Sequence, residues 1–353
     1  MRIQSHTGPY EAVFDEEALE RLDAGPLDGL HLIVDDRVAE LHKARMPRLL
    51  GHSSVLRLEA IEPAKSLERM PDYVAHLLAQ GVRRDHTLVA IGGGIVQDIT
   101  CFLAANLLRG LAWRFLPTTL LAQADSCIGS KSSINCGAAK NILGTFTPPR
   151  SVHISSRFLD TLDERDRRSG LGEMLKVHAI AGPEAFDRIA ADYPRLLADR
   201  ALLNHYIRES LAIKKPYIEE DEFDRGPRNI FNLGHSFGHA IEAATDFAIP
   251  HGIAVTIGIG MALHVGQGMG LVGVDHLVRM RPVLAANARG FETVPVPFEA
   301  FLVALAKDKK NVGQGSVTLI LPDAACRMTK KVVAVDDRFR QLCREFFVEA
   351  WRA

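Results

Sequence analysis

Residues 87–98 read T-L-V-A-I-G-G-G-I-V-Q-D, and this stretch gives the plainest indication of the architecture. Residues 87–91 form an apolar strand candidate, three glycines follow, and a helical pattern starts near Ile95 with Asp98 one turn inside it. Because glycine has no side chain, the backbone here can approach a pyrophosphate, and the free N–H groups of a helix start favour an anion. The spacing is not G-x-G-x-x-G, however, and an ordinary tight turn explains three glycines nearly as well.

Other strand candidates surround this stretch. Residues 30–34 and 55–58 precede it with helical patterns between them, which predicts right-handed βαβ crossovers and a parallel sheet that binds ligands along its carboxyl edge. After a last strand candidate at 151–155, apolar residues recur at helical spacing in segments 170–180, 201–218, 229–245, 253–266, 298–307 and 337–351. The sequence therefore predicts an α/β domain over residues 1–150 and an all-α domain over residues 151–353, with the junction near Pro148 and Pro149.

Composition narrows the class of protein. The 353 residues carry a formal net charge of −1, so no overall attraction to nucleic acid or to an anionic membrane is expected. Five cysteines without a C-x-x-C pair indicate reduced thiols in the cytoplasm rather than a disulfide framework. The apolar segment 253–265 is shorter than the roughly 20 residues that cross a bilayer and is expected to be a buried helix.

The region richest in candidate metal ligands spans residues 228–251 and reads R-N-I-F-N-L-G-H-S-F-G-H-A-I-E-A-A-T-D-F-A-I-P-H. On a helix His235 and His239 lie one turn apart and share a face. Pro250 is expected to end the helix, so that the chain can return His251 toward the first two imidazoles.

A carboxylate would complete this set. Imidazoles with one carboxylate form a typical catalytic zinc site, and Glu173 in E-M-L-K offers that carboxylate beside the cation of Lys176. The stretch lacks the H-E-x-x-H pattern of zinc proteases. A single histidine more often caps or packs in a helix, but Arg228 and Asn232 interleaved with three of them favour a site for chemistry.

A polar segment follows the glycine turn. A helix end at Gly110 leads to a short strand that closes on Pro117, Thr118 and Thr119. The next residues are rich in ammonium, amide, carboxyl and hydroxyl groups: Gln123, Asp125, Ser126, Ser130, Lys131, Ser132, Ser133, Asn135, Lys140 and Asn141. A solvated loop is one interpretation; a surface that binds phosphate and hydroxyl groups is the favoured one. Further cations occur at Lys214, Lys215, Arg228, Lys309 and Lys310.

Between about Asp35 and Lys310 the chain contains, in order, G-G-G-I-V-Q-D, R-G, L-P-T-T-L-L-A-Q-A-D-S, G-S-K, K-N, F-L-D-T-L, G-E-M-L-K and N-L-G-H-S-F-G-H-A-I-E with His251. Together these motifs resemble those of 3-dehydroquinate synthase and its relatives, the sugar phosphate cyclases. The resemblance implies an N-terminal Rossmann-like domain, a helical C-terminal domain, tightly held NAD, a divalent metal (zinc or cobalt) and a homodimer.

The resemblance also implies roles for individual residues. The metal ligands would be Glu173, His235 and His251, so that His239 would face the substrate instead of sharing the ion with His235. Contacts to NAD would come from Asp35, Glu62, Lys65, Gly93, Gly94, Asp98, Thr118, Thr119, Lys131, Lys140, Phe158 and Thr161. Contacts to the sugar phosphate would come from Asp125, Lys131, Asn141, Lys176, Lys214, Arg228, Asn232, His239 and one of Lys309 or Lys310. Arg109 would reach the active site of a neighbouring subunit.

In that family a seven-carbon keto acid phosphate (DAHP) is oxidised by NAD at a ring hydroxyl, loses phosphate, is reduced again and closes to 3-dehydroquinate. The chain departs from the family pattern at Gln97, Ser130, Asp163 and Arg37, which leaves the substrate open. Cyclases that form valiolones or 2-deoxy-scyllo-inosose are the main alternative, followed by a metal-dependent polyol dehydrogenase and a non-catalytic relative. The cations Lys214, Arg228, Lys309 and Lys310 favour the keto acid, because neutral sugar phosphates lack the carboxylate that they would bind.

Overall fold

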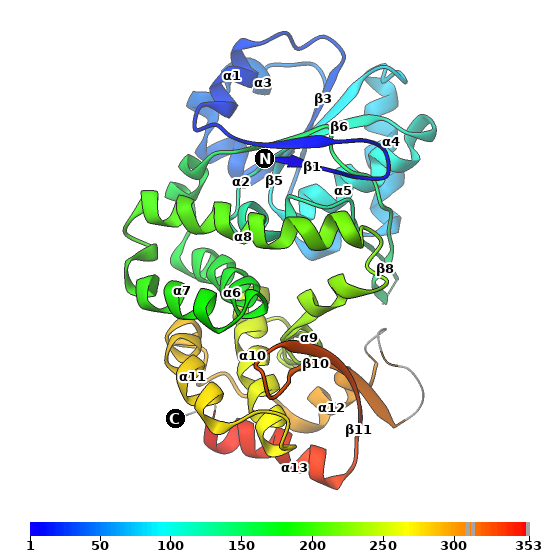
Figure 1. Ribbon diagram of the computed structural model, residues 1–353. Coiled ribbons are helices and arrows are strands. Elements are labelled where there is room, and N and C mark those ends of the chain that lie inside the picture. Colours follow the sequence, from blue (N-terminus) through cyan, green and yellow to red (C-terminus); the bar gives the residue numbers. More distant parts are fainter. Residues whose placement is uncertain (138, 308–310, 312–314, 351–353) are drawn as a thin grey trace. The chain divides into compact units, whose positions relative to one another are not determined.

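A computed structural model of the protein describes residues 1–137, 139–307, 311 and 315–350 (Figure 1). The chain divides into two compact units. The first unit comprises Met1–Leu162 with Lys215–Phe223, and the second comprises Asp163–Lys214 with the residues from Asp224 onward. One of the three chain boundaries between the units falls within a long helix, α8 (Arg200–Glu220).

The first unit is built on a seven-stranded sheet with the strand order β1-β2-β9-β6-β5-β3-β4. All neighbouring strands are parallel except β1, which pairs antiparallel with β2. The strands are β1 (Arg2–Ile3), β2 (Tyr10–Phe14), β3 (Leu30–Asp35), β4 (Val55–Leu58), β5 (Thr87–Gly92), β6 (Ala112–Pro117) and β9 (Ser151–Ile154). The predicted parallel sheet is therefore confirmed. The sequence did not predict β1, a short strand at the edge of the sheet, or β2 beside it.

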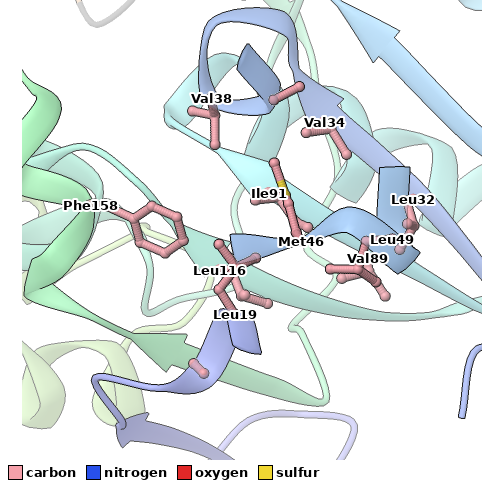
Figure 2. Packing of buried hydrophobic residues seen from close by; sticks show 12 residues of the cluster. Leu19, Leu32, Val34, Val38, Met46, Leu49, Val89, Ile91, Leu116 and Phe158 are labelled. Atoms are coloured by element: carbon pink, nitrogen blue, oxygen red, sulfur yellow. The ribbon is translucent and has the colours of Figure 1, made fainter. Parts of the chain in front are cut away.

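Helices α1 (Ala18–Ala24), α2 (Asp36–Leu41), α3 (Pro47–Leu50), α4 (Met70–Ala79) and α5 (Gly94–Asn106) belong to the same unit. Side chains from α1, α2 and α3 pack on β3 and β5 in one apolar cluster, which Figure 2 shows with Leu19, Val38, Met46 and Ile91 among its members. Burial of this cluster stabilises the sheet, because apolar surface removed from water contributes roughly 25 cal/mol per Å².

The polar segment after β6 is more ordered than a solvated loop. It forms a turn of π-helix, η5 (Ala122–Ser126), and a hairpin of β7 (Ile134–Cys136) and β8 (Ala139–Leu143). The sequence does not predict these strands because their residues are mostly polar. Side-chain hydrogen bonds, rather than an apolar pattern, hold the hairpin.

The second unit is mainly helical, as predicted. Its helices are α6 (Glu164–Ala181), α7 (Pro183–Leu196), α9 (His235–Ala244), α10 (His251–Gly268), α11 (Val274–Ala288), α12 (Phe298–Ala306) and α13 (Asp337–Glu345), with α8 entering from residue 200. An antiparallel hairpin of β10 (Ser316–Pro322) and β11 (Met328–Ala334), which the sequence did not predict, adds to them. Among the described residues no helix is both long and apolar enough to cross a membrane.

Helix α10 lies at the centre of this unit and is buried on nearly all sides. Glycines bring its backbone against those of α6 and α9. A Cβ added to Gly252 would lie 1.8 Å from the Ser169 carbonyl oxygen, and one added to Gly258 would lie 2.1 Å from the Gly234 carbonyl oxygen. Only glycine permits such approaches. They bring the helices that carry Glu173, His235 and His251 side by side.

The predicted helix at 229–245 is interrupted. Residues Pro227–Asn232 form a short helical segment, η7, and α9 starts only at His235. Gly234 between them has φ = 74°, a left-handed conformation that breaks a helix and that favours glycine.

Candidate metal centre and nucleotide-binding turn

Three histidines of the second unit form a cluster. The ligand atoms of His235, His239 and His251 all lie within 4.8 Å of one another. The ring centroids are 5.3 Å apart for His235 and His251, and 5.4 Å apart for His235 and His239. The turn before Pro250 does return His251 to the face of α9, where the sequence placed it.

Glu173 of α6 joins this cluster. Its Oε1 atom lies 3.3 Å from Nε2 of His251 and 3.7 Å from Nε2 of His235. In a tetrahedral site with bonds of about 2.0–2.1 Å, neighbouring donor atoms stand about 3.3 Å apart. One carboxylate oxygen and two imidazole nitrogens therefore have the spacing and the chemistry that suit a zinc-like ion.

The other carboxylate oxygen of Glu173 has a different partner. Lys176 Nζ donates to Oε2 at 2.5 Å, and both side chains are almost fully buried. The ammonium also lies over the Phe231 ring, 5.8 Å from its centroid. The E-M-L-K spacing thus places a cation directly beside the candidate metal ligand, on the same face of α6.

Each of the two facing imidazoles is oriented through its other nitrogen. His235 Nδ1 lies 3.2 Å from the Leu233 carbonyl oxygen, and His251 Nδ1 lies 3.1 Å from Glu242 Oε2. In both rings this contact leaves Nε2 toward Glu173. Burial by itself lowers the pKa of His251, but Glu242 and Glu173 outweigh it and raise that pKa to about 10.

The remaining histidine, His239, is solvent-exposed one turn further along α9. Its ring is stacked on that of His251 at 5.6 Å, so a third imidazole lies within reach of the same ion. A carboxylate-containing set and an all-imidazole set are both compatible with the positions of these groups. The assignment of Glu173, His235 and His251 as the ligands, with His239 facing substrate, stays a prediction.

Predicted substrate residues of the second unit lie on two other elements. Arg228 and Asn232 belong to η7, immediately before the histidine helix, and Arg228 is buried. The Asn232 amide donates to the Asn229 carbonyl oxygen at 3.0 Å. Lys214 is buried on α8. Lys309 and Lys310 lie outside the described residues.

In the first unit, the glycine turn joins β5 to α5. An added Cβ on Gly93 would lie 2.9 Å from Thr119 Cγ2, whereas one on Gly94 would have no atom within 4 Å. Gly93 is the N-cap of α5, and no side chain caps the helix. Open space therefore lies above backbone N–H groups at a helix start, which is a suitable place for a phosphate.

Two neighbouring strands carry predicted nucleotide residues to the same edge of the sheet. In the register of the parallel strands, Val34 pairs with Ile91 and Gly92 with Pro117. Asp35 therefore ends β3 beside the glycine turn, and Thr118 and Thr119 follow β6 on its other side. From β3 the chain continues to β4 on one side, and from β5 it continues to β6 on the other side. Open α/β sheets bind nucleotides at the point where the strand order reverses in this way.

A hydrogen-bond network connects this edge to the β7–β8 hairpin. Lys65 Nζ donates to Asp98 Oδ2 and to Asn141 Oδ1, both at 2.9 Å, and Ser133 N donates to Asp98 Oδ1 at 3.0 Å. Burial raises the pKa of Asp98, although Lys65 opposes that shift. For Lys65, burial opposes the charge, but Asp98 and Glu62 raise the pKa above its usual value. Asn141 has φ = 52°, a conformation that the network maintains.

Comparison with known proteins identifies the family. The chain matches the models for the N-terminal part (residues 55–169) and the C-terminal part (residues 170–311) of 3-dehydroquinate synthase. It is 37% identical over 303 residues to a 3-dehydroquinate synthase of Rhodospirillum rubrum, covering 82% of this chain and 78% of the relative. It is 36% identical over 276 residues to that of Dictyoglomus thermophilum, covering 77% of each.

The chain belongs to the 3-dehydroquinate synthase family. Among solved structures, it is similar to 2-deoxy-scyllo-inosose synthase in complex with carbaglucose-6-phosphate, NAD+ and Co2+, with a TM-score of 0.84, 22% identity and 99% coverage of both chains. It is also similar to 2-epi-5-epi-valiolone synthase from Streptomyces hygroscopicus with NAD+ and Zn2+, with a TM-score of 0.83, 27% identity and 97% coverage of both chains. A probable glycerol dehydrogenase from Sinorhizobium meliloti shares the fold at a TM-score of 0.67 and 14% identity.

Not every residue carried over from the family points its side chain toward open space. Phe158 is 1% exposed and packs in the apolar cluster of the first unit (Figure 2). Its ring is edge-on to that of His42, with 5.1 Å between the ring centroids. The Thr161 hydroxyl donates to the Phe158 carbonyl oxygen at 3.0 Å. The Glu62 carboxylate accepts a hydrogen bond from Asn135 Nδ2 at 3.0 Å. The roles of Phe158, Thr161 and Glu62 in an NAD site stay predictions.

Other residues that the family resemblance suggests lie at more accessible positions. Lys131 and Lys140 are exposed, and Lys140 lies on β8. Asp125 is buried in η5. Arg109 is exposed beside Leu108, and the two residues have φ = 67° and φ = 53°.

Two residues with a clear place in the site were not singled out for it by sequence reasoning. The first is Glu242, which contacts His251. The second is Gln97, which the sequence marks only as a departure from the family pattern. Glu242 could have been found from its spacing, since it lies three residues after His239 and seven after His235 on the same helical face. No local signal could have found the partner of Gln97, because that partner, Ser126, lies on another element.

Proposed function

We propose that this protein is a 3-dehydroquinate synthase, converting a seven-carbon keto acid phosphate (DAHP) to 3-dehydroquinate with release of phosphate. The single observation that carries the proposal is the convergence of Glu173, His235 and His251, with Lys176 beside them, in a chain of this family. NAD and a divalent metal, zinc or cobalt, would be its cofactors. Both occur together in the related cyclase structures.

The second unit would hold the metal through Glu173, His235 and His251. When bound, such an ion acidifies a coordinated hydroxyl, which assists the removal of hydride from the same carbon. Lys176 keeps a positive charge next to the Glu173 carboxylate and would stabilise negative charge on the substrate oxygen. During elimination of phosphate the proton would be accepted by the departing phosphate or by His239, which is exposed on the same helical face.

The first unit would hold NAD. The N-terminus of α5 beside Gly93 and Gly94 would bind the pyrophosphate, and Asp35 at the end of β3 would bind a ribose. Glu62, Lys65, Asp98, Thr118, Thr119, Lys131, Lys140, Phe158 and Thr161 would complete the site, by direct contact or by supporting it. NAD is regenerated in each turnover, so one bound molecule suffices.

Phosphate and carboxylate groups on the substrate require several cations and donors. Asp125, Lys131, Asn141, Lys214, Arg228 and Asn232 would supply them, together with Lys309 or Lys310. Arg228 and Lys214 are buried cations of the second unit. The family resemblance assigns both to the sugar phosphate, and cations at these positions support a substrate that carries a carboxylate as well as a phosphate.

We further propose that the protein acts in the cytoplasm as a homodimer. All five cysteines lie within the described residues and are thiols outside any disulfide, which suits a reducing compartment. Arg109 is exposed on a turn whose two residues adopt left-handed conformations. Such strain is often retained for function, and the family resemblance assigns Arg109 to the active site of a neighbouring subunit.

A second candidate is a cyclase of the valiolone or 2-deoxy-scyllo-inosose type. The similarity to solved structures of both enzymes favours its consideration, as do Gln97 and Ser130 at positions where the family usually has glycine. A polyol dehydrogenase would have the same fold but would form NADH, and a non-catalytic relative would have the same fold without activity.

Phosphate release separates these functions. The purified protein is incubated with NAD and with either Zn2+ or Co2+. Parallel samples receive the keto acid phosphate, heptulose 7-phosphate or glucose 6-phosphate. We expect release with the keto acid phosphate alone, without net formation of NADH. Lys131→Ala and His235→Ala are each expected to abolish it, and full activity of either variant would contradict the proposal. Release only from a neutral sugar phosphate would support the second candidate, and net NADH would indicate a dehydrogenase.

A further inference from the structure

Glu242 contacts one of the candidate metal ligands from behind. Its Oε2 atom lies 3.1 Å from Nδ1 of His251, and the Glu242 side chain is 11% exposed. It lies on α9, and the backbone N–H of Phe247 donates to its carbonyl oxygen at 2.8 Å, which starts the turn toward His251. Glu242 and His251 are therefore brought together by the short connection between α9 and α10.

This contact decides which nitrogen of His251 faces Glu173. A carboxylate accepts hydrogen bonds, so it favours the form of the ring with hydrogen on Nδ1. When the ring gives up its other proton to bind a metal, the lone pair is therefore on Nε2, which lies 3.3 Å from Glu173 Oε1 on the side of the candidate metal site. A metal can only bind the nitrogen that carries the lone pair.

His235 provides a comparison within the same site. Its Nδ1 lies 3.2 Å from the Leu233 carbonyl oxygen, a neutral acceptor, whereas the acceptor of His251 carries a full charge. A carboxylate partner makes an imidazole a stronger donor to a metal than a carbonyl partner does. The two imidazoles thus differ in the charge of the group that accepts from Nδ1.

We propose that Glu242 is a positioning residue of the metal centre, which fixes the orientation of the His251 ring and strengthens its bond to the divalent ion. The inference rests on the proposed function, since it takes His251 to be a metal ligand. Glu242 also adds negative charge next to the site. With Glu173 negative and Lys176 positive, the Glu242 carboxylate reduces the net positive charge that a divalent ion would create there.

Metal affinity tests this role without relying on turnover. The metal-free full-length protein is titrated with Zn2+ against a chromogenic chelator, for the wild type, E242A, E242Q and the control E209Q. Glu209 lies in the same unit, bonds Arg188 at 2.7 Å and faces the exposed His205 at 3.6 Å, so E209Q removes a carboxylate beside a histidine away from the cluster. Circular dichroism of each variant verifies folding.

We expect E242A to bind Zn2+ about 10–100-fold more weakly than the wild type, and E209Q to bind as the wild type does. E242Q should fall between them, because its amide oxygen can still accept a hydrogen bond from Nδ1 while the charge is lost. If E242A does not fold, E242Q, which has nearly the same shape, supplies the comparison. The absorption spectrum of bound Co2+ should shift in E242Q but not in E209Q, as expected if the His251 bond changes.

The outcomes distinguish this inference from the proposed function. A wild-type protein that binds about one ion per chain, with E242Q and E242A indistinguishable from it in affinity and spectrum, would overturn the role of Glu242 and leave the proposed function intact. A wild type that binds no metal would overturn both.

Discussion

Gln97 and Ser126 exchange two hydrogen bonds: the Gln97 amide donates to the Ser126 carbonyl oxygen at 2.6 Å, and the Ser126 hydroxyl donates to the Gln97 side-chain oxygen at 2.7 Å. Gln97 is buried on the first turns of α5, and Ser126 follows Asp125 in η5. Gln97, one of the departures from the family pattern, thus joins α5, the helix at the predicted nucleotide site, to the segment that carries the predicted substrate residue Asp125.

Gln97→Ala should therefore destabilise the first unit. It removes two hydrogen bonds to Ser126, which is half-buried, and this costs about 1–3 kcal/mol in the free energy of unfolding. Urea unfolding measures the loss. Asn106→Ala on the same helix removes only an exposed bond to the Phe102 carbonyl oxygen and should change stability by less than about 0.5 kcal/mol. Equal losses of unfolding free energy in the two variants would show that the Gln97–Ser126 pair stabilises the protein no more than an exposed hydrogen bond does.

Lys176→Met should destabilise the metal-free protein strongly. Removing one member of a buried ion pair leaves the other charge poorly compensated, at a cost of about 3–5 kcal/mol. Because a bound cation can replace part of the lost charge, added Zn2+ should raise the melting temperature of this variant more than that of the wild type. Thermal melts with EDTA and with Zn2+ test both statements.

The matched control is Lys215→Met, which breaks the more exposed pair of Lys215 with Glu219 at 2.6 Å. Such pairs contribute about 0–1 kcal/mol. A Lys176→Met protein as stable in EDTA as this control would contradict the assignment of the buried pair.

The affinity for zinc should rise with pH. In the metal-free protein the raised pKa of His251, about 10, means that its ring is protonated at neutral pH and stabilises the fold below about pH 6.5, an effect lost as pH rises through about 10. A metal must displace that proton. Between pH 7 and 8.5 we expect affinity to increase about tenfold per pH unit, and calorimetry in buffers of different ionisation enthalpy to show proton release. Binding independent of pH would show that the ion displaces no proton from His251 in this range and would contradict the prediction.

Acid should weaken the fold of the first unit through His31. This buried ring lies 2.6 Å from Ser54 Oγ and 2.8 Å from His86 Nδ1, and burial, followed by His86, lowers its pKa to about 4. Since the unfolded value is about 6.5, the unfolded chain binds more protons between these limits, and stability falls as pH falls from 6.5 to 4. His31 does not change stability above that window.

His31→Asn should flatten the dependence of the urea midpoint on pH between 6.5 and 4, even if it lowers stability at pH 7.5. His205→Asn, at a position where the side chain is 66% exposed, should leave that slope unchanged. An unchanged slope in His31→Asn would assign the acid sensitivity to other buried histidines.

Much of the fold follows from local sequence. The strand, glycine turn and helix of residues 87–98 are present as β5 and α5, because an apolar run, flexible glycines and helical spacing act over a few residues. Most predicted helices of the second unit are confirmed for the same reason. The segments 183–196 and 274–288 are helices that the sequence analysis did not identify. The break at Gly234 was also missed, since a glycine in a helical pattern does not reveal its φ.

The sequence by itself determined the parallel sheet and most helices of the second unit, the family, and the presence of imidazoles, a carboxylate and a lysine suited to a metal site. Only the tertiary structure decided that Glu173 faces His235 and His251, that Glu242 lies behind His251, and that Gln97 bonds Ser126. These contacts join residues on different elements. They depend on how closely the backbones of α6, α9 and α10 approach, which glycines such as Gly252 and Gly258 permit, and no local pattern specifies that distance.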